Sequence, residues 1–214
     1  MDKRIKNVTV ASLAICAAAL SLYFAFANRS PKINLDPYDV LGAVTAEETA
    51  KLVANKGEVL IIVRDTGPDK NPPVEAELKA FQRILKKTPR LSAVVERIRV
   101  NPMMMMATGG GVPPDQFLKA LATHPNSAAV VLFFGFPQLA DAELEKLKQS
   151  GAKVVVVSSF RPGYKQLLQR QAIQLAVVPR QDIMPPITQT PRTLRERFDQ
   201  LYTTFTPADT AHLP

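Results

Sequence analysis

The sequence predicts an α/β protein with a three-layer, doubly wound sheet of about five parallel strands, preceded by one N-terminal transmembrane or signal helix. Two observations support this prediction. Short apolar runs alternate with segments of helical periodicity, which is typical of βαβ units. In addition, residues 8–27 form an apolar run without a single charge, and at helical rise such a run spans about 30 Å, the thickness of a bilayer core.

The N-terminal run is predicted to be a signal anchor or a signal peptide. Lys3, Arg4 and Lys6 precede it, and this positive flank places the N-terminus in the cytoplasm and the following domain on the extracytoplasmic, periplasmic side. We favour a retained anchor, because the run is longer than the h-region of about 7–15 residues in a cleaved signal. The membrane is therefore the first predicted partner, through residues 8–27.

Two other interpretations of this run stay open. Ala25-Phe26-Ala27 matches an A-x-A cleavage site, and cleavage between Ala27 and Asn28 would release a secreted protein. A lipoprotein signal at Cys16 is the least favoured, because the bulky Ile15 stands where a small residue is required. Each interpretation exports the domain. Since Cys16 is the only cysteine, no disulfide can form within the chain.

The rest of the chain divides into three predicted regions. Residues 28–44 resemble a linker, residues 45–182 form the α/β domain, and residues 183–214 form a Pro-rich C-terminal extension with a short helix. Thr45 and Glu48 have the spacing of a capping box, so a helix is expected to begin at Thr45.

Five apolar runs within the α/β domain are the predicted strands. The crossovers between them should be right-handed, helices should cover both faces, and the expected strand order is 2-1-3-4-5. The runs are residues 59–63, 94–100, 128–134, 153–158 and 173–178.

A succession of phrases from about Gly57 to Arg180 resembles one lobe of the type 1 periplasmic-binding-protein fold, which is flavodoxin-like. The phrases are VLIIV, AAVVLFFGFP, DAEL, GAKVVVVSS and AIQLAVVPR. Members of that family have two lobes and bind a sugar or another small solute in the cleft between them. The resemblance therefore implies a ligand-binding domain, although this chain has room for one lobe, and another subunit would have to supply the opposite wall.

Candidate ligand-binding residues lie where the predicted strands end, because ligands of open α/β sheets bind outside the carboxyl ends of the strands. These loops offer cations, hydroxyls and backbone amides that could hold a carboxylate or a phosphate. Ordinary turn chemistry with solvated charges is the competing interpretation. The candidates are Arg64, Asp65, Thr66, Gly135, Phe136, Ser158, Ser159, Arg161 and Arg180.

One predicted loop contains a methionine run and a glycine run. Met103, Met104, Met105 and Met106 are candidate partner contacts, because methionine forms adaptable apolar surfaces. No histidine or cysteine stands near them, so no metal site is expected there. Gly109–Gly111 matches neither the P-loop pattern nor the dinucleotide-binding pattern and is expected to be a flexible loop.

No catalytic residues and no cofactor are predicted. The sequence lacks HExxH and GxSxG motifs, and His124 should lie at the opposite edge of the sheet from Ser158 and Ser159. The net charge of +8 suggests nucleic acid as a partner, but aromatic and basic residues are not interleaved as in nucleic-acid-binding surfaces, so no nucleic acid is expected.

The sequence therefore predicts a non-catalytic, membrane-tethered, extracytoplasmic module for ligand sensing or protein interaction. Its predicted partners are a small-molecule ligand and a protein, which could be a second copy of the chain. Two alternatives stay open. One is an enzyme that acts on a small anionic substrate at the strand-end loops. The other is a structural subunit of an envelope assembly.

Overall fold

The computed structural model describes residues 14–24, 33–67, 71–157, 163–180 and 191–212. The chain forms two compact units, Met1–Asn34 and Leu35–Pro214. In the first unit, residues 14–24 are helical. No helix among the described residues is both long enough and apolar enough to cross a bilayer, and the predicted segment 8–27 extends beyond the described helix at both ends.

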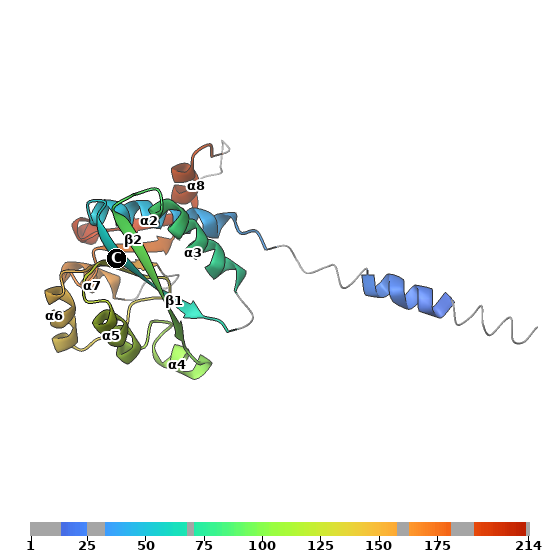
Figure 1. The fold of residues 1–214 in the computed structure, drawn as a ribbon, viewed down its shortest axis with the longest axis horizontal. Coiled ribbons are helices and arrows are strands. Elements are labelled where there is room, and N and C mark those ends of the chain that lie inside the picture. The colour runs from blue at the N-terminus through green and yellow to red at the C-terminus, as the bar shows by residue number, and fades with distance from the viewer. Residues whose placement is uncertain (1–13, 25–32, 68–70, 158–162, 181–190, 213–214) are drawn as a thin grey trace, which may run out of the picture. The chain divides into compact units, whose positions relative to one another are not determined.

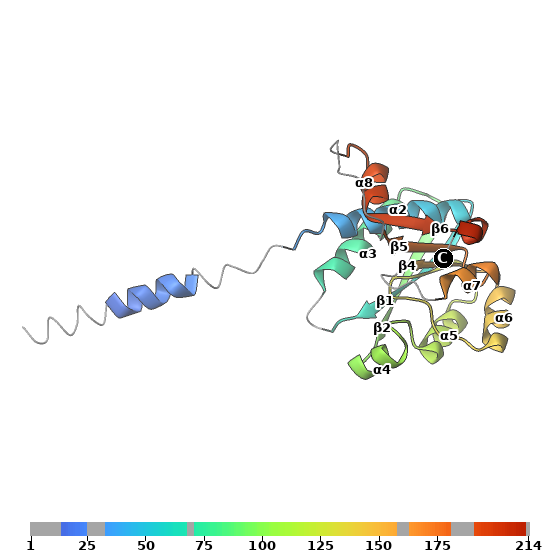
Figure 2. The same ribbon diagram turned by 180° about the vertical axis from the view of Figure 1, so that it is seen from behind.

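The second unit is built on a six-stranded sheet with the order β2-β1-β3-β4-β5-β6. Figure 2 labels β2, β1, β4, β5 and β6 of this sheet. The first five strands are parallel, and β6 pairs antiparallel with β5. The predicted fold class and the predicted order 2-1-3-4-5 are therefore confirmed, and β6 is an addition at the edge. The bounds are β1 Gly57–Asp65, β2 Leu91–Arg99, β3 Ser127–Leu132, β4 Lys153–Val157, β5 Leu175–Pro179 and β6 Tyr202–Phe205.

Helices cover both faces of the sheet and make three layers (Figures 1 and 2). Side chains alternate between the two faces along each strand, so β1 sends Val59, Ile61 and Val63 into one core and Leu60 and Ile62 into the other. The first core is closed by α2 (Asp36–Leu52), α3 (Pro72–Leu85) and α8 (Leu194–Leu201). The second is closed by α5 (Pro114–Thr123), α6 (Asp141–Gln149) and α7 (Tyr164–Gln169).

The start of α2 corrects one prediction. The helix begins at Asp36, so residues 36–44 are helical rather than part of a linker. Pro37 stands in the first turn, where proline is favoured, and Asp36 and Asp39 add negative charge at the helix N-terminus. Thr45 is fully buried in the middle of this helix and caps nothing, so the predicted start at Thr45 is wrong.

The C-terminal region is part of the fold. The predicted short helix is α8, and Thr193 caps it, because its hydroxyl accepts a hydrogen bond from the Glu196 backbone N–H at 3.1 Å. After α8, β6 extends the sheet, and a 3₁₀-helix follows at Pro207–His212.

Candidate functional site

Several cavities lie along the carboxyl edge of the sheet, where β1 to β5 end. Three of them contain side chains that could bind a ligand. We name them the loop cavity, the arginine cavity and the Glu77 cavity, with volumes of about 290, 530 and 420 Å³. Their position agrees with the rule that ligands of open α/β sheets bind at this edge.

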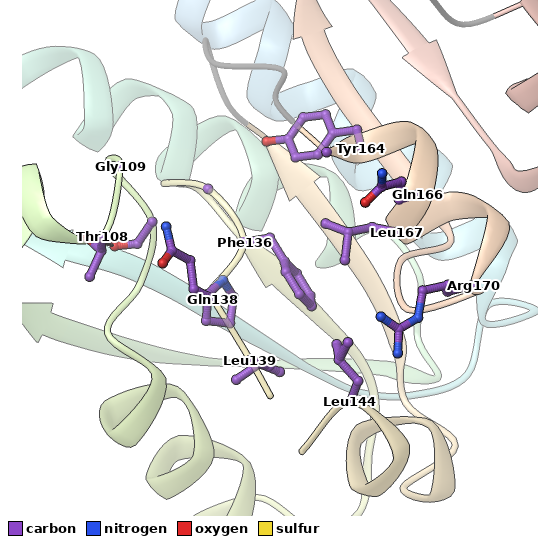
Figure 3. Close-up of a pocket in the computed structure, with 14 residues that line it drawn as sticks. Thr108, Gly109, Phe136, Gln138, Leu139, Leu144, Tyr164, Gln166, Leu167 and Arg170 are labelled. Atoms are coloured by element: carbon purple, nitrogen blue, oxygen red, sulfur yellow. Dashed lines mark hydrogen bonds between the residues drawn. The ribbon is translucent and has the colours of Figure 1, made fainter. Parts of the chain in front are cut away.

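The loop cavity lies between two loops and two helices. The loops follow α4 (Pro102–Ala107) and β3, and the helices are α6 and α7. Figure 3 shows Phe136 in the middle of the cavity, with Gln138 on one side and Arg170 on the other. Its remaining lining residues are Thr108, Gly109, Gly111, Gly135, Pro137, Leu139, Leu144, Gly163, Tyr164, Gln166 and Leu167.

Glycines hold the two loops of this cavity against each other. A Cβ on Gly111 would lie 2.5 Å from the backbone oxygen of Phe136, so no larger residue can stand there without moving a loop. Gly135 has φ +71°, and a Cβ there would lie 3.2 Å from the Cα of Gly111. The glycine run that suggested a flexible loop is therefore explained in part by close backbone packing.

The chemistry of the loop cavity is apolar with neutral polar groups. Leu139, Leu144 and Leu167 line it beside the Phe136 ring. Gln138 and Gln166 each bring an amide that can both donate and accept hydrogen bonds. Arg170 is the only cation among the described lining residues, and its Nη2 donates to Asp141 Oδ1 at 2.7 Å, so its charge is balanced.

The arginine cavity contains the predicted residues Arg64, Asp65 and Thr66, together with Arg99, Asn101 and Met104. The Nε of Arg64 is buried and has no hydrogen-bond partner. The Asp65 carboxylate accepts a hydrogen bond from the Gly67 N–H at 2.9 Å and so closes the turn after β1. The charged groups of this cavity are therefore two guanidinium groups, from Arg64 and Arg99, and one carboxylate, from Asp65.

The Glu77 cavity lies where α2 and α3 cover the ends of β4, β5 and β6. Glu77 is only 9% exposed, and burial raises the pKa of its carboxyl to about 7. Tyr38 and Tyr202 share the cavity. The pKa of Tyr202 rises to about 12 because of burial first, and then because of Glu77 and Tyr38.

Tight helix packing closes this cavity. A Cβ on Gly42 of α2 would lie 2.1 Å from the backbone oxygen of Glu77 in α3, so only glycine allows the helices to approach this closely. The sequence prediction missed Glu77. A signal existed, because Glu77 falls with Val74, Leu78 and Phe81 on the stripe of α3 that packs inward.

The predicted site residues do not all line the same cavity. Arg64, Asp65 and Thr66 line the arginine cavity, whereas Gly135 and Phe136 line the loop cavity. Arg180 donates from Nη1 to the backbone oxygen of Asp199 at 2.7 Å and lines none of the three cavities. Ser158, Ser159 and Arg161 lie outside the described residues.

The methionine run forms the short helix α4 rather than a loop. The Asn101 side chain caps this helix by accepting a hydrogen bond from the Met104 N–H at 2.7 Å. Met103 and Met106 are 82% and 85% exposed, whereas Met105 packs against the second core. The helix therefore presents thioethers to its surroundings.

His124 lies near the amino edge of the sheet, directly after α5. Its Nε2 is 3.1 Å from Glu96 Oε1, and its Nδ1 is 3.6 Å from Glu58 Oε1. Within the described ranges, no group of three or more His, Cys, Asp or Glu residues is arranged to hold a metal ion.

Comparisons with known proteins found similarity to solved structures but not to known sequence families. No protein-family model matches the sequence, and no curated protein sequence matches it. The arabinose-binding protein AraP from Geobacillus stearothermophilus has a TM-score of 0.55 at 17% identity, over 83% of this chain and 63% of AraP.

Two further solved structures give the same result. The sugar-binding protein of a Bacillus halodurans sugar ABC transporter has a TM-score of 0.52 at 12% identity, over 82% of this chain and 63% of that chain. A periplasmic solute-binding protein from Actinobacillus succinogenes, solved with bound D-allose, has a TM-score of 0.51 at 13% identity, over 85% of this chain and 62% of that chain. This chain therefore spans less than two thirds of each of these proteins. Its domain has a fold like that of type 1 periplasmic binding proteins, as the sequence resemblance to one lobe implied.

Proposed function

We propose that this protein is a non-catalytic, membrane-tethered extracytoplasmic module that binds a small polyhydroxylated solute in the loop cavity. The observation behind this proposal is the placement of that cavity at the carboxyl edge of the sheet, in a fold shared with proteins named for binding arabinose and other sugars. Both the fold and the lining chemistry support a solute of this class.

The lining of the loop cavity suits a neutral sugar. A sugar ring has an apolar face of C–H groups, which can pack on the Phe136 ring, and hydroxyls, which need both donors and acceptors. The amides of Gln138 and Gln166 provide both. Because Asp141 already balances the charge of Arg170, a neutral ligand leaves no buried charge without a partner.

A second subunit would complete the binding site in this proposal. The chain spans 63% of AraP, and its described residues contain one sheet, which provides one wall at the carboxyl edge. A second copy of the chain or another protein would cover the ligand from the other side. Binding of the ligand would then increase the fraction of the dimer or of the complex.

Isothermal titration calorimetry of the full chain in mild detergent tests the ligand class. We expect one member of a panel of aldopentoses and aldohexoses to bind. Gln138→Ala should weaken that binding at least tenfold, or about 1.4 kcal/mol. The matched control is Gln149→Ala, an exposed residue of α6 outside the cavity. Absence of binding at millimolar sugar, or equal effects of both substitutions, would exclude this ligand class.

The proposed tether rests on residues 8–27 and on the positive charges before them. We expect the chain to stay with membranes after alkaline carbonate extraction, and protease added outside spheroplasts to degrade the domain. A chain recovered from the cytosol and protected in intact spheroplasts would contradict both the tether and the location.

The exposed methionines of α4 favour a second candidate function, contact with a partner protein in an envelope assembly. Met103 and Met106 expose most of their side chains, and methionine adapts to varied apolar surfaces. Photo-crosslinking from position 103 in cells should then give a defined protein adduct. The same crosslinker at exposed Gln149 of α6 is the control.

A further inference from the structure

We propose that the Glu77 cavity is a second ligand site, which binds a small organic cation made of an ammonium group on an apolar body. Among the described residues, the loop cavity and the Glu77 cavity share no lining residue, and this inference does not rest on the proposed solute site. Three features of the cavity lead to it: a carboxyl without a partner, aromatic rings beside that carboxyl, and an otherwise apolar lining.

The carboxyl of Glu77 has no hydrogen bond and no ion pair within the described part of the chain. Arginines of α3 and β2 pair with other carboxylates: Arg83 pairs with Asp39 at 2.8 Å, and Arg97 pairs with Glu75 at 2.8 Å. A carboxyl that is 9% exposed normally has a partner, because burying its charge alone is costly. A cation that enters the cavity could therefore pair with Glu77.

Burial also explains why such a cation would be held selectively. The pKa of Glu77 is raised to about 7, so at neutral pH about half of the carboxyl groups are ionised. Tyr202 has a pKa of about 12 and remains neutral, and so it adds no second negative charge. An ammonium group beside Glu77 would restore to the carboxylate the favourable interactions that burial removed.

The remaining lining determines the body of the ligand. Tyr38, Phe133 and Tyr202 bring aromatic rings to the cavity, and ring faces attract cations. Val74, Val157 and Val177 provide apolar contacts for a hydrocarbon group. A volume of about 420 Å³ accommodates a small amine with one ring.

Calorimetry of the full chain in mild detergent at pH 8 tests this site with benzylamine and its neutral analogue benzyl alcohol. We expect benzylamine to bind at least tenfold more tightly than the alcohol. Glu77→Gln should reduce the difference between the two to less than threefold. Glu47→Gln, which removes a carboxylate of α2 that does not line the cavity, should leave the difference unchanged.

The pH dependence provides a second readout that a structural role of Glu77 would not change. With a pKa of about 7, the ionised fraction of Glu77 falls about 30-fold from pH 8 to pH 5.5, and benzylamine affinity should fall with it. The Glu77→Gln variant should remain folded by near-UV circular dichroism and show no such fall. Equal affinities for both probes, or full benzylamine binding by a folded Glu77→Gln variant, would overturn the proposal.

Discussion

The amino and carboxyl edges of the sheet differ in how their polar side chains are paired. Near the amino edge, Ser127 Oγ donates to Glu58 Oε1 at 3.1 Å, and His124 bridges Glu58 and Glu96. A small cavity of about 170 Å³ lies there too, but its Gln174 side chain bonds to the backbone of Val154 and Gln171. The polar groups of this edge are therefore paired with one another.

The carboxyl edge leaves polar groups without partners in larger cavities. Among the described residues, Arg64 Nε is buried without a hydrogen-bond partner, and burial raises the pKa of the Glu77 carboxyl to about 7. Buried polar groups are normally satisfied, so an unsatisfied one needs an explanation. The paired groups of the amino edge join β1, β2 and β3, whereas the larger cavities lie at the carboxyl edge.

The largest effect should come from Gly42→Ala, which forces α2 and α3 apart. The new Cβ would lie 2.1 Å from the Glu77 backbone oxygen, so the helices must separate or the backbone must shift. We expect a loss of about 3 kcal/mol in the free energy of unfolding, measured by urea titration with far-UV circular dichroism. A loss below about 0.5 kcal/mol would show that the cover of the Glu77 cavity adapts easily.

The second effect is a fall of stability with pH that originates at the carboxyl edge. Glu77 has a pKa of about 7 in the folded chain and 4.5 as its ordinary value, so between these pH values the folded state holds a proton that the unfolded state has released. The contribution to stability is complete below pH 4.5, falls as pH rises to about 7, and then stays constant. The fall amounts to roughly 3 kcal/mol.

Glu77→Gln is the variant that isolates this contribution. It should remove the fall between pH 4.5 and pH 7 in urea titrations, whereas Glu47→Gln should keep it. If Glu77→Gln and the unmodified chain have the same pH profile, the carboxyl is not buried as the structure places it.

A smaller effect is expected at the amino edge from His124→Ala. This substitution removes the contact with Glu96 at 3.1 Å and should cost about 1 kcal/mol of stability. Solute binding in calorimetry should stay within twofold of the unmodified chain, because the loop cavity lies at the other edge. A tenfold loss of solute affinity in His124→Ala would contradict the separation of the two edges.

The smallest effect on stability is expected from replacing Met103 and Met106 with serine. Both side chains are mostly exposed, so the change should stay within about 0.5 kcal/mol in the same urea titration. Loss of the adduct formed from position 103 in the single variant Met106→Ser, without a loss of stability, would favour a partner contact at α4. A loss above 1 kcal/mol would instead assign these methionines a packing role.

The sequence predicted the parts of the fold that depend on local patterns. Apolar runs such as 59–63 and 153–158 marked buried strands, and their alternation with helices determined the parallel order. The start of α2 was missed because the Thr45 and Glu48 spacing was preferred over the Asp36-Pro37 signal. The strand β6 was missed because Tyr202–Phe205 is too short to show a pattern, and pairing with β5 stabilises it.

The candidate site was predicted only as an edge of the sheet. The rule about strand ends located Arg64 and Phe136 beside cavities. It could not identify Gln138, Arg170 or Glu77, because helix packing and loop contacts decide which side chains share a cavity. Glu77 is a charged residue on the inward stripe of α3, and an analysis of apolar periodicity alone passes over charged residues.

Native mass spectrometry of the full chain, isolated from its source membranes in mild detergent, tests most directly whether the carboxyl edge binds a solute. We predict a population that carries an added mass of a few hundred daltons or less, absent from the Gln138→Ala variant and retained by His124→Ala. Bare polypeptide in every preparation, or an added mass that persists in Gln138→Ala and disappears in His124→Ala, would contradict this assignment.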